Sequence, residues 1–353
     1  MQNDLRRLGW DPVLEAASTT LLDEGTVPGR VVVAHRGGWL VRTAFDDELR
    51  TEPAGRLRQA ATGPLDLPTV GDWVAVRPSP GGGGLVVAVL PRRTALVRRR
   101  PGPVTEEQVL AANVDVALCC VSAGEGPRNA RRLERYLTLA WDAGTTPAAV
   151  LTKADLCDDV DGAVAELGPA VAGVEVVVAS SVTGDGIDAL RAVLPTGRTG
   201  VLLGPSGVGK SSIANRLLED DHLDVGAVRD VDGRGRHTTT RRELTELPRG
   251  GLLIDTPGLR EVGLWDGGGT DATFADVHEL AAACRFADCH HDGEPGCAVH
   301  AAVAAGTLAG DRMDAFTKLR REEEWLARRK DARAASEHRR KVRSTERQRR
   351  KRR

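Results

Sequence analysis

The sequence has few aromatic residues, two methionines and six cysteines among its 353 positions. Phenylalanine, tryptophan and tyrosine together make up 3% of the chain, whereas hydrophobic residues make up 41%. The hydrophobic cores must therefore be built mainly from valine, leucine and alanine. The length of the chain predicts two or three domains rather than one.

The sequence also lacks a long apolar run. No stretch approaches the roughly 20 apolar residues that a membrane-spanning helix needs, and residues 1–7 contain no hydrophobic core of a secretory signal. We therefore expect a cytosolic (cytoplasmic) protein with no membrane partner. In that compartment, six cysteines are more typical of free thiols or metal ligands than of disulfides.

Charge is distributed unevenly, although the net charge is only −1. Residues 318–353 contain 17 lysines and arginines against 6 aspartates and glutamates, so this segment carries +11 and the rest of the chain −12. Such a tail favours a polyanionic partner, and contacts with RNA phosphates would add salt-dependent affinity. The alternative is a solvated extension that binds no specific partner.

The pattern of short segments changes along the chain and predicts a multidomain fold. Residues 1–28 are expected to form a short helix and a linker. Residues 29–103 contain short strands and glycine-rich turns, which are typical of a β-barrel of the oligonucleotide-binding (OB) type. The barrel has either an RNA-binding face or a structural or protein-docking role, and the sequence favours neither. The clearest strands are residues 30–35, 38–42, 70–76 and 85–90.

Residues 104–265 alternate between apolar strands and helices. This alternation predicts an α/β domain with a mostly parallel sheet and a ligand at the carboxyl ends of the strands. The expected strands are residues 114–121, 147–151, 174–179, 201–203 and 252–254, and the expected helices are residues 131–143 and 213–218.

A glycine-rich stretch lies between one of these strands and a helix, which is the context of a phosphate-binding loop (P-loop). The glycine backbone can curl so that its N–H groups face an anion. Lys210 is placed to reach the β- and γ-phosphates, and the Ser211 hydroxyl to ligate Mg²⁺. The alternative is a turn with a solvent-exposed lysine. The stretch consists of Gly204, Pro205, Ser206, Gly207, Val208, Gly209, Lys210, Ser211 and Ser212.

A second motif, Asp255-Thr256-Pro257-Gly258, follows the last predicted strand. The Asp255 carboxylate can hold Mg²⁺, and the Gly258 N–H can meet the γ-phosphate. Asp255 and Ser211 are therefore the candidate Mg²⁺ ligands.

The third motif, Thr152-Lys153-Ala154-Asp155, is the candidate base-specificity motif. The Asp155 carboxylate can accept hydrogen bonds from N1–H and the N2 amine of guanine, and the Lys153 stem can lie along the ring. Ser180 and Ser181 would bring a backbone N–H to guanine O6. The three motifs together favour GTP over ATP.

The order of these motifs is unusual, because the base-specificity motif and the serine loop precede the P-loop. A circular permutation produces this order and leaves the site unchanged, since a parallel sheet tolerates new connections. After residues 255–258 the chain runs straight into the C-terminal region. We hypothesise that the nucleotide state is transmitted to whatever that region binds.

Residues 266–333 are expected to form a helical domain, with helices at 298–308 and 311–333, and residues 334–353 a basic tail that is disordered when free. Residues 284–297 carry a C-x4-C-x-H-x5-C pattern. Three thiolates and one imidazole make a closed, structural Zn²⁺ site. The alternative is three free cysteines. The candidate ligands are Cys284, Cys289, Cys297 and either His290 or His291.

The permuted motif order and the cysteine pattern resemble the RsgA or YjeQ family of circularly permuted, ribosome small subunit-dependent GTPases. The resemblance covers nearly the whole chain and includes residues 112–115, 151–156 and 235–240. It implies an N-terminal barrel, a permuted GTPase domain and a zinc domain. It also implies GTP/GDP, Mg²⁺ and one structural Zn²⁺ per monomer as cofactors. The implied function is slow GTP hydrolysis stimulated by the small (30S) ribosomal subunit, and late maturation of that subunit and its rRNA alongside other assembly factors.

The resemblance also assigns roles to single residues. It favours His291 as the fourth zinc ligand, because His291 matches the family's spacing. It suggests His237 as the catalytic residue, although an exposed loop histidine is the alternative. Leu259 stands where many GTPases have a water-orienting glutamine, so intrinsic hydrolysis should be low.

Two further details concern threonines. Thr239 or Thr240 would ligate Mg²⁺ in the GTP state. Thr152 stands where asparagine is commoner, so it should bridge the P-loop differently and nucleotide affinity should be modest. The competing interpretations are a P-loop ATPase and a non-catalytic RNA-binding placeholder whose nucleotide only sets affinity.

Overall fold

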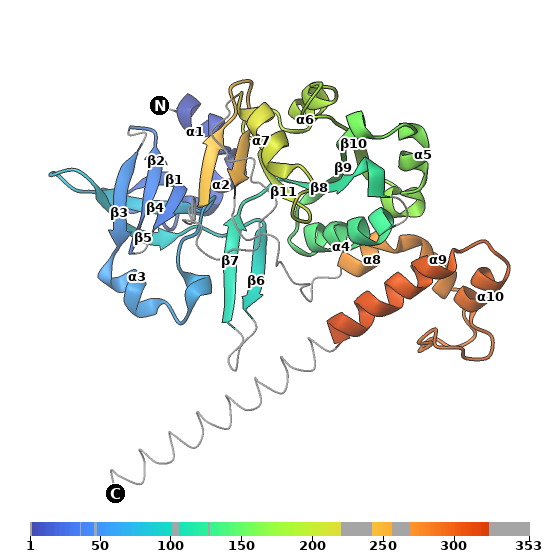
Figure 1. The fold of residues 1–353 in the computed structure, drawn as a ribbon. Helices are drawn as coiled ribbons and strands as arrows, with labels where there is room; N and C mark the ends of the chain where they lie inside the picture. The colour runs from blue at the N-terminus through green and yellow to red at the C-terminus, as the bar shows by residue number, and fades with distance from the viewer. Residues whose placement is uncertain are drawn as a thin grey trace, which may run out of the picture. The chain divides into compact units, whose positions relative to one another are not determined.

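The computed structural model describes residues 2–35, 37–45, 48–100, 106–125, 128–219, 242–255 and 269–324 (Figure 1). The chain divides into two compact units, Met1–Gly263 and Leu264–Arg353. Among the described helices, none is both long and apolar enough to cross a membrane.

Five strands close into a barrel in the N-terminal part of the first unit. Neighbouring strands follow the order β1-β2-β3-β5-β4, and β4 pairs back with β1. Valines, Trp39 and Leu49 from these strands fill the interior, so the predicted OB-type barrel is confirmed. The strands are β1 (Val27–His35), β2 (Gly38–Thr43), β3 (Leu49–Pro53), β4 (Trp73–Pro78) and β5 (Gly84–Val89), with α3 (Gly55–Ala60) and η1 (Pro64–Asp66) between β3 and β4.

The N-terminal segment contains two helices, α1 (Gln2–Arg7) and α2 (Pro12–Ser18), rather than one helix and a linker. The Asp11 side chain caps α2 by accepting a hydrogen bond from the Leu14 N–H. The Trp10 ring packs edge-on against Trp73 of β4, with ring centroids 4.9 Å apart. The segment is therefore packed against the barrel.

The predicted α/β domain is confirmed. Strands β8, β9, β10, β11 and β13 are parallel, and they are adjacent in the order β10-β9-β8-β11-β13. The core between sheet and helices consists mostly of valine, leucine and alanine. The strands are β8 (Val116–Ser122), β9 (Thr146–Thr152), β10 (Glu175–Val178), β11 (Thr199–Leu203) and β13 (Leu252–Asp255). The helices are η2 (Ala123–Glu125), α4 (Arg128–Asp142), η3 (Ala154–Leu156), α5 (Val160–Ala165), η4 (Gly168–Val171), α6 (Ile187–Val193) and α7 (Lys210–Leu218).

Strand β12 (Arg242–Glu246), which no pattern in the sequence predicts, joins the two sheets. It pairs antiparallel with β13 on one side and with β1 of the barrel on the other. Barrel and parallel sheet thus form one 11-stranded sheet. A separate hairpin of β6 (Ala95–Arg100) and β7 (Glu106–Ala112) spans the domain boundary expected at residue 103.

The guanidinium of Arg30, from β1, is buried where the N-terminal segment, the barrel and the parallel sheet meet. It donates hydrogen bonds to the Leu8 carbonyl, to the Asn113 carbonyl at 3.0 Å and to Thr199 Oγ1 of β11 at 2.8 Å. It also lies over the Trp73 ring, 5.3 Å from the centroid. Burial lowers the pKa of Arg30 to about 10, so the group is still a cation at neutral pH.

The second unit is helical. The described elements are α8 (Gly269–Thr273), α9 (Ala275–Ala281), α10 (Ala298–Ala304) and the helical residues 310–324. Phe274 and Phe316 pack edge-to-face in its core, with centroids 5.5 Å apart. The expected helix 298–308 ends at Ala304, and the chain turns at Gly306, whose φ is +73°. The remainder of the expected helix 311–333 and the tail 334–353 lie outside the described residues.

We predict that Arg30→Met lowers the free energy of unfolding of the chain by about 3 kcal/mol, because it leaves three buried acceptors without their donor. Urea denaturation measures the change. Arg77→Met is the control, since its ion pair with Asp23 is exposed and should contribute at most about 1 kcal/mol. Equal stability of the two variants would contradict a structural role for Arg30.

Candidate nucleotide and metal sites

Three sequence motifs follow the carboxyl ends of parallel strands in one sheet. The base-specificity motif ends β9, the serine loop follows β10 and the P-loop follows β11. Helices α4, α6 and α7 flank these strands in Figure 1. Because β10, β9, β8 and β11 are adjacent and parallel, the structure brings the three motifs together at one edge of the sheet.

The P-loop has the curled backbone that the motif requires. Gly204, Gly207 and Gly209 all have positive φ angles, of +148°, +75° and +104°. A Cβ at Gly204 would lie 2.6 Å from the Cys120 carbonyl oxygen, so this position needs glycine. The Lys210 ammonium donates to the carbonyls of Gly204 at 2.8 Å and Pro205 at 2.6 Å. The cation therefore lies across the loop, where phosphate oxygens could replace these two carbonyls as its acceptors.

The Thr152 hydroxyl connects the base-specificity motif to the P-loop. Its oxygen is 2.5 Å from the Val208 carbonyl oxygen and 3.1 Å from the Val121 carbonyl oxygen, and the side chain is buried. A hydroxyl has one proton to share between these acceptors, whereas an asparagine amide has two. Thr152 thus does reach the P-loop, but with fewer donors than asparagine would provide.

Ser180 orients the carboxylate of Asp155. Its hydroxyl donates to Asp155 Oδ1 at 2.5 Å and accepts hydrogen bonds from the N–H groups of Val182 at 3.1 Å and Thr183 at 3.2 Å. Ser180 is buried, while Asp155 is exposed and can meet a ligand. The arrangement presents a carboxylate of fixed direction at the edge of the sheet, as guanine recognition requires.

Lys153 has a left-handed backbone with a φ of +58°, which turns the chain out of β9 and into η3. Its Cε lies 4.0 Å from the position that a Cβ on Gly209 would occupy. The lysine stem therefore runs beside the P-loop. A base held by Asp155 could lie along this stem.

Arg216 is a contact of this site that the sequence analysis missed. Its guanidinium extends from α7 and donates to the carbonyls of Ser181 at 2.6 Å and Val182 at 3.2 Å. No motif includes this position, and an exposed arginine on a helix gives no signal in a sequence.

Several predicted residues cannot be placed. Asp255 ends β13 beside β11 and β12, but its side chain and residues 256–258 lie outside the described part of the chain. The same holds for Leu259, His237, Thr239 and Thr240. Their roles remain predictions.

The second unit brings three thiols and one imidazole together. The ligand atoms of Cys284, Cys289, His291 and Cys297 all lie within 4.8 Å of one another. The Sγ atoms of Cys284 and Cys297 are 4.0 Å apart, and His291 Nδ1 is 3.6 Å and 3.4 Å from them. These separations and donors match tetrahedral Zn²⁺ coordination. The proximity of the four groups favours a metal site over the alternative of three free cysteines.

Backbone N–H groups face two of the sulfurs: the Ala298 N–H donates to Cys284 and the His300 N–H to Cys297. Burial raises the pKa of the Cys284 thiol, but the backbone N–H groups of Ala298 and Val299 and the neighbouring thiols outweigh it and lower the pKa. Burial and the neighbouring thiols raise the pKa of Cys289 to about 11. A cation bound between the thiols would favour their ionised form, since a coordinating thiol is deprotonated.

Of the two neighbouring histidines, His291 lies in the cluster and His290 outside it. The His291 backbone has a φ of +59°, which turns its ring inward, and the residue is buried. The backbone N–H of His290 donates to Glu294, and Arg320 donates to its carbonyl. Backbone conformation therefore distinguishes two histidines whose side-chain chemistry makes them equally good candidate ligands.

Comparison with known proteins agrees with this geometry. The family model described as RsgA GTPase matches residues 89–265. A Streptomyces coelicolor protein named small ribosomal subunit biogenesis GTPase RsgA is 48% identical over 94% of this chain and 90% of its own length. The crystal structure of YjeQ from Thermotoga maritima is 27% identical, covers 85% of this chain and 99% of that one, and superposes with a TM-score of 0.64. YloQ, titled a circularly permuted GTPase, shares the fold at 24% identity and a TM-score of 0.61 over 85% of this chain and 96% of its own. The chain therefore belongs to the RsgA GTPase family.

Proposed function

We propose that this protein is a cytoplasmic, Mg²⁺-dependent GTPase that binds the small (30S) ribosomal subunit and assists its late maturation. GTP hydrolysis is slow until the subunit stimulates it. The convergence of the P-loop, Asp155 and the serine loop at one sheet edge carries the proposal, because this arrangement recognises a guanine nucleotide. The partner is inferred from the name of the relative from Streptomyces coelicolor.

Each group at the site has a role in this proposal. The P-loop, residues 204–212, holds the phosphates, with Ser211 and Asp255 as Mg²⁺ ligands and Gly258 at the γ-phosphate. Thr152–Asp155 and Ser180–Ser181 hold the base. His237 acts on the attacking water, since Leu259 cannot orient it. The last role rests on the family resemblance.

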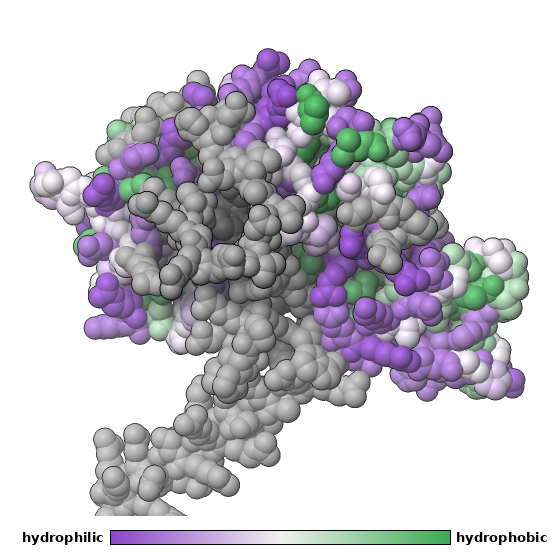
Figure 2. Space-filling view, viewed as in Figure 1, coloured by the Kyte–Doolittle hydropathy of each residue, from purple (hydrophilic) through white to green (hydrophobic). Residues whose placement is uncertain are grey.

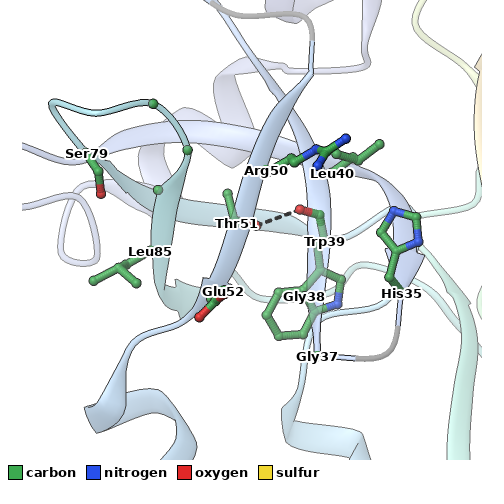
Figure 3. Close-up of a pocket in the computed structure, with 13 residues that line it drawn as sticks. His35, Gly37, Gly38, Trp39, Leu40, Arg50, Thr51, Glu52, Ser79 and Leu85 are labelled. Carbon is green, nitrogen blue, oxygen red and sulfur yellow. Dashed lines mark hydrogen bonds between the residues drawn. The ribbon is translucent and has the colours of Figure 1, made fainter.

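The barrel offers a face for rRNA. A groove of about 710 Å³ is lined by β2, β3 and the loops β1–β2 and β4–β5 (Figure 3), which is the side on which OB folds bind oligonucleotides. His35 and Arg50 supply polar and cationic groups there, and the Thr51 hydroxyl donates to the Trp39 carbonyl at 3.1 Å. Gly82 and Gly83 in the β4–β5 loop and Gly84 at the start of β5 have no side chain and allow a nucleic-acid backbone to approach closely.

The exposed surface also favours a polar partner and a monomeric protein. Among the residues coloured on the face shown in Figure 2, hydrophobic residues form small separate patches between hydrophilic ones. The exposed large hydrophobic residues among those described are scattered along the chain and single residues of this kind need no partner. They are Val13, Phe45, Leu85, Leu156, Val182 and Phe286.

The first test is GTP hydrolysis by the purified protein with and without small ribosomal subunits, at fixed salt. We expect strong stimulation by small subunits and none by large subunits or bulk RNA. Stimulation by any RNA would show that the protein responds to polyanions in general and not to the small subunit. Absence of stimulation would remove the ribosomal assignment and leave the nucleotide site.

We predict that Asp155→Asn weakens GTP binding about 100-fold, because the amide keeps only one of the two acceptor oxygens, and a hydrogen bond to a charged group contributes about 1.5–3 kcal/mol. Nucleotide titration by calorimetry measures the loss, and ATP binding should stay weak in both proteins. Asp158→Asn is the control, since Asp158 is an exposed carboxylate of the same loop. Unchanged selectivity in Asp155→Asn would favour the rival ATPase interpretation.

The metal site gives a second prediction. The purified protein should contain one zinc per chain by mass spectrometry, and His291→Ala should lose it and the helical content of the second unit, because structural zinc binding contributes to folding. His290→Ala is the matched control and should keep its zinc. Retention of zinc by His291→Ala would show that the fourth ligand is another group.

A further inference from the structure

Arg216 connects α7, the helix that follows the P-loop, to the serine loop, which would contact the base and is called the base loop below. Helix α7 begins at Lys210, whose ammonium lies across the P-loop, and carries Arg216 on the same rigid element. The Arg216 guanidinium donates to two successive carbonyls, those of Ser181 and Val182. One helix thus holds the phosphate-binding lysine at its start and the base loop near its end.

One N–H of the loop that Arg216 holds takes no part in the hydrogen bonds found within that loop. The Val182 and Thr183 N–H groups donate to Ser180 Oγ, and the Ser180 N–H donates to the Asp185 carbonyl at 2.9 Å. Within the described residues, the Ser181 N–H makes no hydrogen bond. It is therefore the group of this loop that can donate to the O6 atom of guanine.

The Ser181 N–H lies in the peptide plane that it shares with the Ser180 carbonyl, and the next peptide plane, which carries the Ser181 carbonyl, limits how the first plane can turn. The first plane is held by the Gly184 N–H, which donates to the Ser180 carbonyl at 3.0 Å. The plane after it is held on its carbonyl side by Arg216, at 2.6 Å. Without Arg216, this second plane would keep only the 3.1 Å bond from the Val182 N–H to Ser180 Oγ.

The loop has little apolar packing to fix it in place. Val182 is 72% exposed, so hydrogen bonds rather than burial hold this segment. Arg216 is itself anchored, because Arg191 of α6 donates to its backbone carbonyl at 3.0 Å and pairs with Glu219 at 3.1 Å. The guanidinium therefore extends from a fixed point.

We propose that Arg216 is a positioning residue for guanine recognition. It holds the Ser181 N–H toward the base and, through the loop that carries Ser180, keeps the Asp155 carboxylate in its binding orientation. It also couples the two halves of the site, because α7 contacts the phosphates at its start and the base loop near its end. This inference rests on the proposed nucleotide site and adds a residue to it.

The test is the dissociation rate of a fluorescent GDP analogue, measured by stopped flow. Arg216→Ala should release the nucleotide about tenfold faster than the unchanged protein, and Arg216→Lys should lie between them, because an ammonium can replace one of two hydrogen bonds. Arg249→Ala is the matched control. Arg249 is 63% exposed and pairs with Glu219 at 2.9 Å, so its loss removes the same charge from the same region without touching the base loop.

A second measurement separates positioning from general stability. Combining Arg216→Ala with Ser180→Ala should accelerate release by less than the product of the single effects, since both act through one loop. Release from Arg216→Ala within twofold of Arg249→Ala, or fully multiplicative effects, would overturn the inference. Failure of the unchanged protein to bind the GDP analogue would instead refute the proposed nucleotide site.

Discussion

The structure depends on a short strand that belongs to two sheets at once. Strand β12 pairs with β13 of the nucleotide-binding sheet and with β1 of the barrel, and Glu243 lies opposite both Asp255 and Val33. Each sheet would otherwise present unpaired backbone groups along that side. The shared strand satisfies both edges and makes the barrel an extension of the GTPase sheet instead of a tethered neighbour.

Polar side chains reinforce the same junction. Glu246, at the end of β12, pairs with Arg7 of α1 at 3.2 Å and with Arg42 of β2 at 3.4 Å. Arg30 adds its buried hydrogen bonds to the N-terminal segment and to β11. Ion pairs that are partly exposed contribute little stability, so the backbone pairing and the Arg30 hydrogen bonds determine the geometry of the junction. The N-terminal segment, expected to be partly a linker, is instead a structural part of it.

The sequence predicts those parts of the fold whose signal is local. Strands β8 and β11 are buried along their whole length and appear as apolar runs, and the P-loop residues share one motif. Strands β3 and β12 are mostly polar and form because distant strands pair with them, so no local pattern reveals them. Arg216 is missed for the same reason, since its contacts reach residues 34 and 35 positions away. His290 and His291 have the same side chain and differ only in backbone conformation, so the side-chain chemistry does not distinguish which of them is the metal ligand.

The shared strand also changes where a nucleotide signal can travel. The order of the motifs suggests that the nucleotide state is transmitted to the C-terminal region, which follows residues 255–258 along the chain. The described residues contain another connection, through paired strands. Asp255 lies opposite Glu243, and Glu243 lies opposite Val33, so Asp255 and Val33 are two strand spacings, or about 10 Å, apart. Strand β1 then continues from Val33 to His35, which lines the barrel groove. Paired strands move together, because sliding one past the next breaks its hydrogen bonds. Were nucleotide binding to displace β12, it would therefore also displace β1 and the groove, and by thermodynamic linkage a ligand in the groove would act back on the nucleotide site.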